Sequence, residues 1–324
     1  MLKRTILVAT LAAAASAVSP SFGQETFPRK PIKIVLPVPA GSALDIATRA
    51  IADDLTAQLG QPVFVEPRPG AGGLIAAQAV VSAPADGYTL LGGAASLYTI
   101  LPAQKEKLSV DVNKDFTHIG MIVGSAALFV AVSPKLGVSS FSEFVSLAKS
   151  KPGHIVVGTN GGGTLTHFAA LAIEKRGGVP ITVVPYNQGG TTAVVADILG
   201  GRVHATIEAA FGLRGALQSG DLQLIGQMTL APEPEFPDVQ LVAQTIPELT
   251  AIGFLNLAAP AGTPEPIVRR LAVALQRALD SPAVKKRYAD LGIPIRNMTP
   301  VATKAFVENE QKIWWPLVKE FSPQ

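Results

Sequence analysis

Two segments far apart in the chain repeat one order of elements: a buried strand, a turn of small residues and a helix. In the first, the apolar run Ile32–Pro37 leads into the turn 38–45 and a helix. In the second, Ile155–Val157 leads into the glycine-rich turn 158–167 and a helix over Phe168–Lys175. At such a junction, free backbone N–H groups meet the positive end of the helix dipole, which favours an anion. The two units therefore predict two jaws that hold one anionic ligand.

Strand and helix signals alternate along the whole chain, which predicts an α/β fold with helices packed on mostly parallel sheets. The 324 residues are enough for two domains of ordinary size. A hydrophobic fraction of 48% with only 16% charged residues predicts large buried cores and excludes a disordered chain. We therefore expect two domains, each a mostly parallel sheet flanked by helices.

The first 23 residues have the features of a secretory signal peptide. Lys3 and Arg4 form a basic start, Thr5–Val18 is apolar or small, and small residues precede a cleavage site after Gly23. The alternative, a membrane anchor, needs about 20 apolar residues, and this run is shorter. The chain has no cysteine, which excludes disulfides, thiol nucleophiles and thiolate metal sites. These features predict a mature protein of the bacterial periplasm.

Charge and motifs exclude several classes of function. The net charge is +3, and Lys3 and Arg4 account for two of these charges, so the rest of the chain is almost neutral and unsuited to nucleic acid. Neither glycine-rich turn has the P-loop or Gly-x-Gly-x-x-Gly pattern, and no Gly-x-Ser-x-Gly motif is present. The four histidines occur singly, without the spacing of a metal site. We predict no catalytic residue, metal or cofactor; a secreted hydrolase with a triad of distant residues is the enzymatic alternative.

The candidate ligand-binding residues come from turns that follow strands, because ligands of open α/β sheets bind beyond the carboxyl ends of strands. Neither main turn contains Lys or Arg, so recognition of a carboxylate would rest on neutral donors and helix ends. The first turn contributes Ala40, Gly41, Ser42 and Ala43, and the turn 91–96 contributes Gly93 and Ser96. The second turn contributes Thr159, Asn160, Gly162, Gly163, Thr164, Thr166 and His167, and the turn 186–190 contributes Tyr186.

Several of these positions also have a structural interpretation. Asp45 fits the first turn of a helix, where an acid stabilises the N-terminus, and we favour that role over ligand contact. His167 is either a buried, hydrogen-bonded structural residue or a ligand partner, and we favour the former. Phe211 and Tyr98 either line the pocket or belong to the core.

Six short segments occur in an order and spacing typical of one protein family. They are Pro31–Pro37, Arg68–Gly73, Asp86–Leu91, Val184–Tyr186, Leu199–Val203 and Pro260–Pro264. Over its whole mature length the chain resembles the Bug family, also called TctC-like, of periplasmic substrate-binding proteins of tripartite tricarboxylate transporters.

The resemblance implies a two-domain Venus flytrap fold with a ligand cleft between the domains. Residues 24–125 and 235–324 would form domain 1, and residues 126–234 would form domain 2. It also implies a monomer that captures a small organic carboxylate, which is aliphatic, aromatic or an amino acid, and delivers it to integral membrane transporter subunits. The alternative is a sensing subunit that signals to a membrane receptor.

Glu208 is a further candidate that the resemblance brings out. It falls where amino-acid binders of the family carry an acid that faces an ammonium group. The alternative for Glu208 is a surface acid at the end of a strand.

Overall fold

The computed structural model describes residues 27–104 and 108–321. The predicted signal peptide, residues 1–23, lies outside these ranges. In the two described stretches, no helix combines the length and the hydropathy that crossing a bilayer requires.

Strands and helices alternate through most of the chain. The strands are β1 (Ile32–Leu36), β2 (Val63–Pro67), β3 (Thr89–Ala94), β4 (Phe116–Val132), β5 (Ile155–Thr159), β6 (Ile181–Pro185), β7 (Ala205–Ala209), β8 (Gln223–Gln227) and β9 (Ile252–Pro260). The α-helices are α1 (Ala43–Leu59), α2 (Leu74–Val81), α3 (Ala95–Thr99), α4 (Leu101–Gln104), α5 (Phe141–Ser150), α6 (Leu165–Lys175), α7 (Gly190–Leu199), α8 (Ala210–Gln218), α9 (Glu265–Asp280), α10 (Pro282–Leu291) and α11 (Pro300–Phe321). Short 3₁₀ turns are η1 (Ala71–Gly73), η2 (Pro134–Leu136) and η3 (Val242–Gln244).

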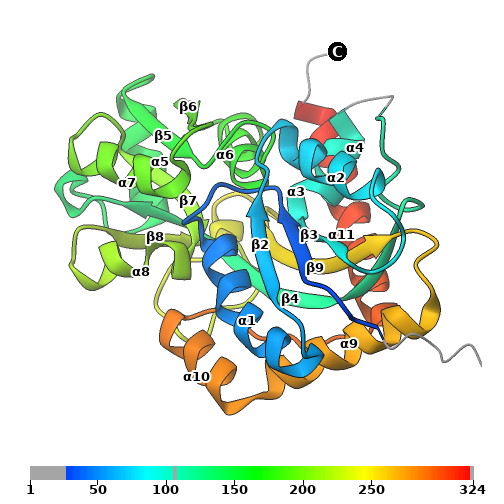
Figure 1. Ribbon diagram of the computed structural model, residues 1–324. Coiled ribbons are helices and arrows are strands. Elements are labelled where there is room, and N and C mark those ends of the chain that lie inside the picture. Colours follow the sequence, from blue (N-terminus) through cyan, green and yellow to red (C-terminus); the bar gives the residue numbers. More distant parts are fainter. Residues whose placement is uncertain (1–26, 105–107, 322–324) are drawn as a thin grey trace, which may run out of the picture.

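The elements gather in two lobes (Figure 1). Strands β5 to β8 with α7 and α8, drawn mostly in green, form one lobe, and the blue N-terminal and orange to red C-terminal elements form the other. The strand order is β2-β1-β3-β9-β4-β7-β5-β6, with β8 paired to β4. The expected two-domain α/β fold class is confirmed.

The outer strands of each lobe are parallel, as the sequence predicts, and the middle of the sheet is antiparallel. β1 is parallel to β2 and β3, and β5 is parallel to β6 and β7. β4 and β9 are antiparallel to each other; β9 is also antiparallel to β3, and β4 to β7 and β8. The reason is connectivity: β4 carries the chain out of the first lobe and β9 brings it back, so the two strands run in opposite directions.

The 17-residue strand β4 joins the two lobes. It pairs with β9 over residues 116–127 and with β7 and β8 over residues 128–132. The pairing with β9 is irregular between Val123 and Ala126, where Ser125 adopts a positive φ of 42°. A Cβ on Gly124 would clash with the Cβ of Arg296, so only glycine fits beside the chain that leads into α11. β4 therefore bends at the point where it passes between the lobes.

Local signals explain where the helices next to the cleft begin. The side chain of Ser42 accepts a hydrogen bond from the Asp45 amide and caps α1, and Thr164 caps α6 in the same way through the His167 amide. Helix α1 ends at Gly60, which adopts the left-handed conformation with a φ of 71°. On the opposite side of the first lobe, α11 packs on β4 and α3 and buries Trp314 almost completely. Each capped helix follows directly from a strand of the sheet, α1 from β1 and α6 from β5.

Candidate functional site

A pocket of about 90 Å³, here called the front pocket, lies between the two lobes. Its lining combines a few polar residues with apolar walls. The polar members are Ser42, Ser96, Asn160, Thr164, Thr166 and Glu208. The others are Val38, Leu44, Ala94, Ala95, Ala126, Leu128, Leu165, Ala209, Phe211, Gly253 and Phe254. Among the described residues that line this pocket, none is Lys or Arg.

The N-terminal ends of four helices converge on the front pocket. Ser42 caps α1, Ala94 precedes α3, Thr164 caps α6 and Ala209 precedes α8, and all four residues line the pocket. The first-turn amides of a helix have no partner within that helix, and the helix dipole places partial positive charge there. The helix ends therefore supply positive potential to the pocket, although its described lining residues include no Lys or Arg.

In the first turn, an internal carboxylate occupies part of the expected anion cradle. The Gly41 amide donates to Asp45 Oδ2 at 2.9 Å, and Arg49 Nε donates to both carboxylate oxygens of Asp45 at 3.0 and 2.9 Å. Asp45 is only 2% exposed. The structure thus gives Asp45 the helix-terminal role that the sequence favoured, and leaves Val38, Ser42 and Leu44 as the residues of this turn that line the pocket.

In the second turn, hydroxyl and amide side chains form a chain of hydrogen bonds. Thr164 Oγ1 donates to the carbonyl of Gly161 at 2.7 Å and lies 3.0 Å from Thr166 Oγ1. The Thr166 hydroxyl donates to Asn160 Oδ1 at 2.7 Å. Because each side chain is held by its neighbour, the polar wall of the pocket is already oriented before a ligand arrives.

Glu208 ends this chain and is buried, with 5% exposure, which excludes the surface-acid alternative. Its Oε2 accepts hydrogen bonds from Asn160 Nδ2 at 2.7 Å and from the Thr191 hydroxyl at 2.6 Å, and its Oε1 accepts from the Ala209 amide at 2.9 Å. Burial raises the pKa of Glu208, and the three donors only partly oppose that effect. The pocket therefore contains one acid that retains its proton more strongly than a free glutamate does.

The structure brings six of the predicted site residues to the front pocket and places others elsewhere. The six are its polar lining residues named above. Ala40 is exposed and Ala43 is the first residue of α1. The amide of Gly162 donates to Asn187 Oδ1 at 2.9 Å, and the amide of Gly163 donates to His167 Nδ1 at 3.2 Å. His167 thus stabilises the turn through this hydrogen bond, in agreement with its structural interpretation. Burial lowers the pKa of His167.

Three further predicted residues, Gly93, Thr159 and Tyr186, are not among the residues that line the front pocket. Gly93 lies on β3, where a Cβ would clash with Asn256 Oδ1 and the Tyr98 hydroxyl. Thr159 is fully buried, and its hydroxyl has no hydrogen-bond partner among the described residues. The Tyr186 hydroxyl donates to Asp197, and its ring lies beside Gly158. Of the two aromatic residues left open by the sequence, Phe211 lines the pocket and Tyr98 is core.

Apart from Phe211, the sequence did not single out the apolar residues that line the front pocket. Ala126 and Leu128 are alternate residues of β4, and they face the pocket because side chains alternate along a strand. The two glycines of α8, Gly212 and Gly215, weaken its helix signal, so that the helix carrying Phe211 was not predicted. A period-two count along β4 was the one signal available.

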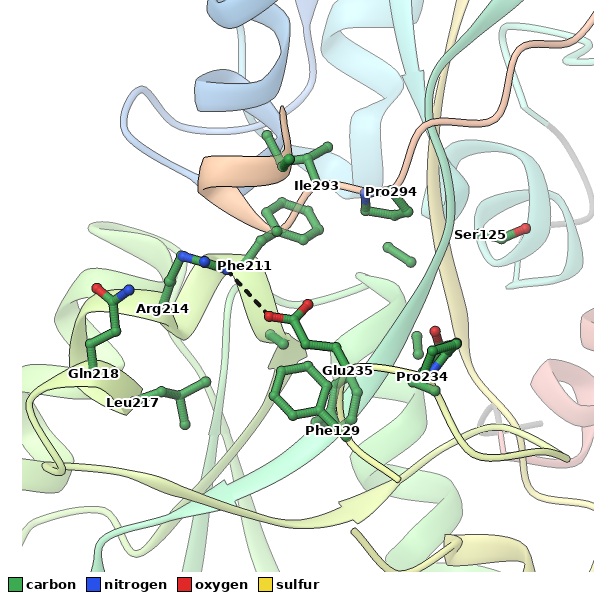
Figure 2. Close-up of a pocket in the computed structure, with 17 residues that line it drawn as sticks. Ser125, Phe129, Phe211, Arg214, Leu217, Gln218, Pro234, Glu235, Ile293 and Pro294 are labelled. Carbon is green, nitrogen blue, oxygen red and sulfur yellow. Dashed lines mark ion pairs between the residues drawn. The ribbon is translucent and has the colours of Figure 1, made fainter. Parts of the chain in front are cut away.

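A larger cavity of about 650 Å³, here called the rear cavity, lies between α8, the middle of β4 and the chain segments 233–236 and 289–294. Figure 2 shows Arg214 pointing to Glu235, with the two charged groups 3.5 Å apart, and Phe211 next to Ile293. Among the described residues that line the rear cavity, the one cationic side chain, Arg214, already faces Glu235. Of the described helices, only α8 has its N-terminus at this cavity. The rear cavity is therefore the weaker candidate for an anion site.

Comparison with known proteins agrees with the family that the sequence resembles. The model of the tripartite tricarboxylate transporter family receptor matches residues 47–322. BugT of Bordetella pertussis is 31% identical over 323 residues, which cover 98% of this chain and 97% of BugT.

Solved structures show the same fold. MatC from Rhodopseudomonas palustris with bound malate superposes with a TM-score of 0.81 and 28% identity, covering 90% of this chain and 100% of that one. R. palustris Rpa4515 with adipate gives a TM-score of 0.84 and 26% identity, covering 91% and 98%. The chain therefore belongs to the tripartite tricarboxylate transporter receptor family, the Bug or TctC-like periplasmic solute-binding proteins, which are not enzymes.

Proposed function

We propose that this protein captures a small organic carboxylate in the front pocket and delivers it, as a monomer, to the membrane subunits of a tripartite tricarboxylate-type transporter. One observation carries the proposal: four helix N-termini converge on a pocket whose described lining residues include no Lys or Arg. Helix ends and neutral donors bind a carboxylate without a permanent ion pair, which suits a carrier that must also release its ligand.

The donors are distributed over both lobes. Leu44 is at the second position of α1 and Leu165 at the first position of α6, so their amides belong to the unpaired first turns that face the pocket. The hydroxyls of Ser42 and Ser96 come from the first lobe and that of Thr166 from the second. A carboxylate held between these groups contacts both lobes, so its binding favours the closed arrangement.

Glu208 restricts the other end of the ligand. When this buried acid is ionised it only accepts hydrogen bonds, so a ligand group next to it must then donate a hydrogen bond or carry a positive charge. A hydroxyl or an ammonium group meets that requirement, and so does the proton of a second, protonated acid. The malate held by MatC is a carboxylate with such a hydroxyl.

We further propose the domain boundaries and targeting that the sequence predicts. Residues 24–125 and 235–324 form domain 1 and residues 126–234 form domain 2; the change of partners along β4 near residue 127 supports this division. Residues 1–23 direct the chain to the periplasm and are removed. N-terminal sequencing of the exported protein tests the cleavage site.

Thermal unfolding of the mature protein with a panel of acids tests ligand capture. The protein is first unfolded and refolded to remove any retained ligand, and the panel contains hydroxy acids, di- and tricarboxylates, amino acids and benzene carboxylates. A ligand at 100 times its dissociation constant adds about 2.7 kcal/mol, which raises the unfolding midpoint by several degrees. A flat response to every carboxylate would overturn the proposal.

A pair of matched variants shows whether a positive response comes from the front pocket. Thr166→Val removes a lining hydroxyl and should weaken binding by about tenfold, which corresponds to about 1.4 kcal/mol. Thr303→Val makes the same change at a fully buried position of α11 and should leave the affinity unchanged. Loss of uptake of the identified acid in cells without the gene then tests delivery to the transporter.

A further inference from the structure

The front pocket and the rear cavity share part of their walls. Of the described residues, Ala126 and Phe211 line both cavities. Ala126 is a small residue of β4, and Phe211 is a half-buried aromatic residue at the second position of α8. The two spaces are therefore neighbours, and Phe211 is the larger of the two side chains that they share.

The alternation of β4 explains why the two cavities lie back to back. Ser125, Ala127 and Phe129 line the rear cavity, and Leu128 lines the front pocket. Because successive side chains of a strand point to opposite faces, the two cavities lie on the two faces of β4. The strand separates the cavities over residues 125–129, and at its edge, where pairing with β7 begins at Leu128, the wall is made of side chains that include Phe211.

Helix α8 places Phe211 at that edge. Its residues Ala210, Arg214, Leu217 and Gln218 line the rear cavity, which is the spacing of one helix face. The residue before the helix, Ala209, lines the front pocket. Phe211 lies where α8 passes from one cavity to the other, so its side chain forms part of the wall between them.

We propose that Phe211 limits the length of the ligand and that the protein selects short-chain carboxylates. This inference rests on the proposed function of the front pocket. At about 90 Å³ that pocket is far smaller than the neighbouring rear cavity, which favours a short di- or hydroxy-carboxylic acid. The rear cavity of about 650 Å³ behind Phe211 is large enough for a long aliphatic chain.

Removal of the ring should open the front pocket into the rear cavity. The methylenes of a longer dicarboxylate then pass Ala126 and lie against Leu217 and Phe129, and its second carboxylate competes with Glu235 for Arg214, which also lines the rear cavity. Each methylene that becomes buried there adds about fourfold to the affinity. The order of affinities along a series of straight-chain dicarboxylates should therefore reverse.

The experiment uses the mature protein, refolded to remove ligand, and calorimetric titration with succinate, adipate and suberate. Phe211→Ala opens the wall and Phe211→Leu opens it in part. Phe236→Ala is the matched control, because Phe236 lines the rear cavity but not the front pocket. Its ring packs edge to face on Phe129, with ring centres 5.1 Å apart. Circular dichroism verifies folding, and if Phe211→Ala fails to fold, the result is taken from Phe211→Leu.

We expect wild type and Phe236→Ala to bind succinate best and suberate at least about tenfold more weakly. Phe211→Ala should bind suberate at least about tenfold more tightly than wild type does. Two results would overturn this inference and leave the proposed function intact. One is an unchanged order of affinities in Phe211→Ala. The other is that Phe211→Ala binds none of the three acids while wild type still binds succinate. If wild type binds no carboxylate at all, the proposed function fails and this inference fails with it.

Discussion

Asn160 donates a hydrogen bond of 2.7 Å to Glu208, although the two residues are 48 positions apart in the chain. The contact joins the turn after β5 to the end of β7, and through Thr166 it reaches the first turn of α6. The one acid of the front pocket is therefore part of the same hydrogen-bonded wall as the neutral donors. That arrangement makes the affinity for a ligand sensitive to the protonation of Glu208.

Glu208→Gln should change how binding depends on pH. In wild type, Glu208 loses its proton as the pH rises through its raised pKa, and the resulting charge repels a nearby carboxylate. For a ligand with carboxylates only, affinity in wild type should fall by about tenfold over this range, whereas Glu208→Gln should bind independently of pH. Titration calorimetry at several pH values measures both profiles.

An ammonium-bearing ligand should respond to Glu208→Gln in the opposite direction, since the variant removes its counter-charge. Glu233→Gln is the control, because Glu233 also has a pKa raised by burial but lines the rear cavity. Identical pH profiles in wild type and Glu208→Gln would mean that the ligand does not approach this acid.

Gly72→Ala should weaken ligand binding by holding the lobes apart. Gly72 adopts a φ of 65°, and a Cβ there would lie 3.4 Å from the carbonyl oxygen of Gly163 in the other lobe. At 3.4 Å the methyl group is just in contact, so it should resist any closer approach of the two backbones when a ligand binds and cost affinity severalfold. Titration with the acid identified for wild type measures the effect.

Gly60→Ala is the matched control for Gly72→Ala. Gly60 has a φ of 71° with no atom within 4 Å of the added Cβ, so it carries the same backbone penalty of about 1 kcal/mol without touching the other lobe. Both variants should lose similar stability, and only Gly72→Ala should lose affinity. Equal affinities would show that closure does not require this contact.

Asp45→Ala should destabilise the first lobe by about 1 to 2 kcal/mol, because Gly41 loses its acceptor and α1 loses its N-terminal acid. Urea unfolding measures the loss. Asp53→Ala, on the same helix with a side chain 83% exposed, should stay within about 0.5 kcal/mol of wild type. Equal effects of the two substitutions would contradict the capping role of Asp45.

Glu310→Gln should stabilise the protein at alkaline pH. Burial in α11 raises the pKa of Glu310 to about 7, with Arg296 partly opposing, so the folded state retains the proton that the unfolded chain releases near pH 4.5. Stability from this proton is complete below pH 4.5 and is lost as the pH rises through 7. At about pH 8.5 the free energy of unfolding of the variant should therefore exceed that of wild type by about 2 to 3 kcal/mol.

At about pH 4 the Glu310→Gln variant and wild type should unfold at the same urea concentration, since both carry a neutral side chain. Glu308→Gln, which changes a half-exposed acid two residues away on the same helix, is the matched control. If Glu310→Gln changed the free energy of unfolding equally at both pH values, the change would come from altered packing and not from the titration of Glu310.

The fold class and family followed from local patterns in the sequence. Each strand–turn–helix unit is specified by neighbours: an apolar strand, a small-residue turn, and the caps Ser42 and Thr164 that bond amides three residues on. The antiparallel middle of the sheet did not follow from these patterns, because β4 and β9 pair across more than a hundred residues. Alternation of strands and helices says nothing about such a pair.

The site divides in the same way. Sequence alone predicted that two small-residue turns would present helix N-termini to one site, because capping and the helix dipole act within a few residues, and residues of both turns line the front pocket. Tertiary structure decided which residues face it. The Tyr186 hydroxyl donates to Asp197, and the Gly41 amide donates to Asp45. Glu208 is a buried acid that accepts a hydrogen bond from Asn160. These outcomes depend on how β4 bends and where α8 begins, and such distances between remote elements are set only when the whole core packs.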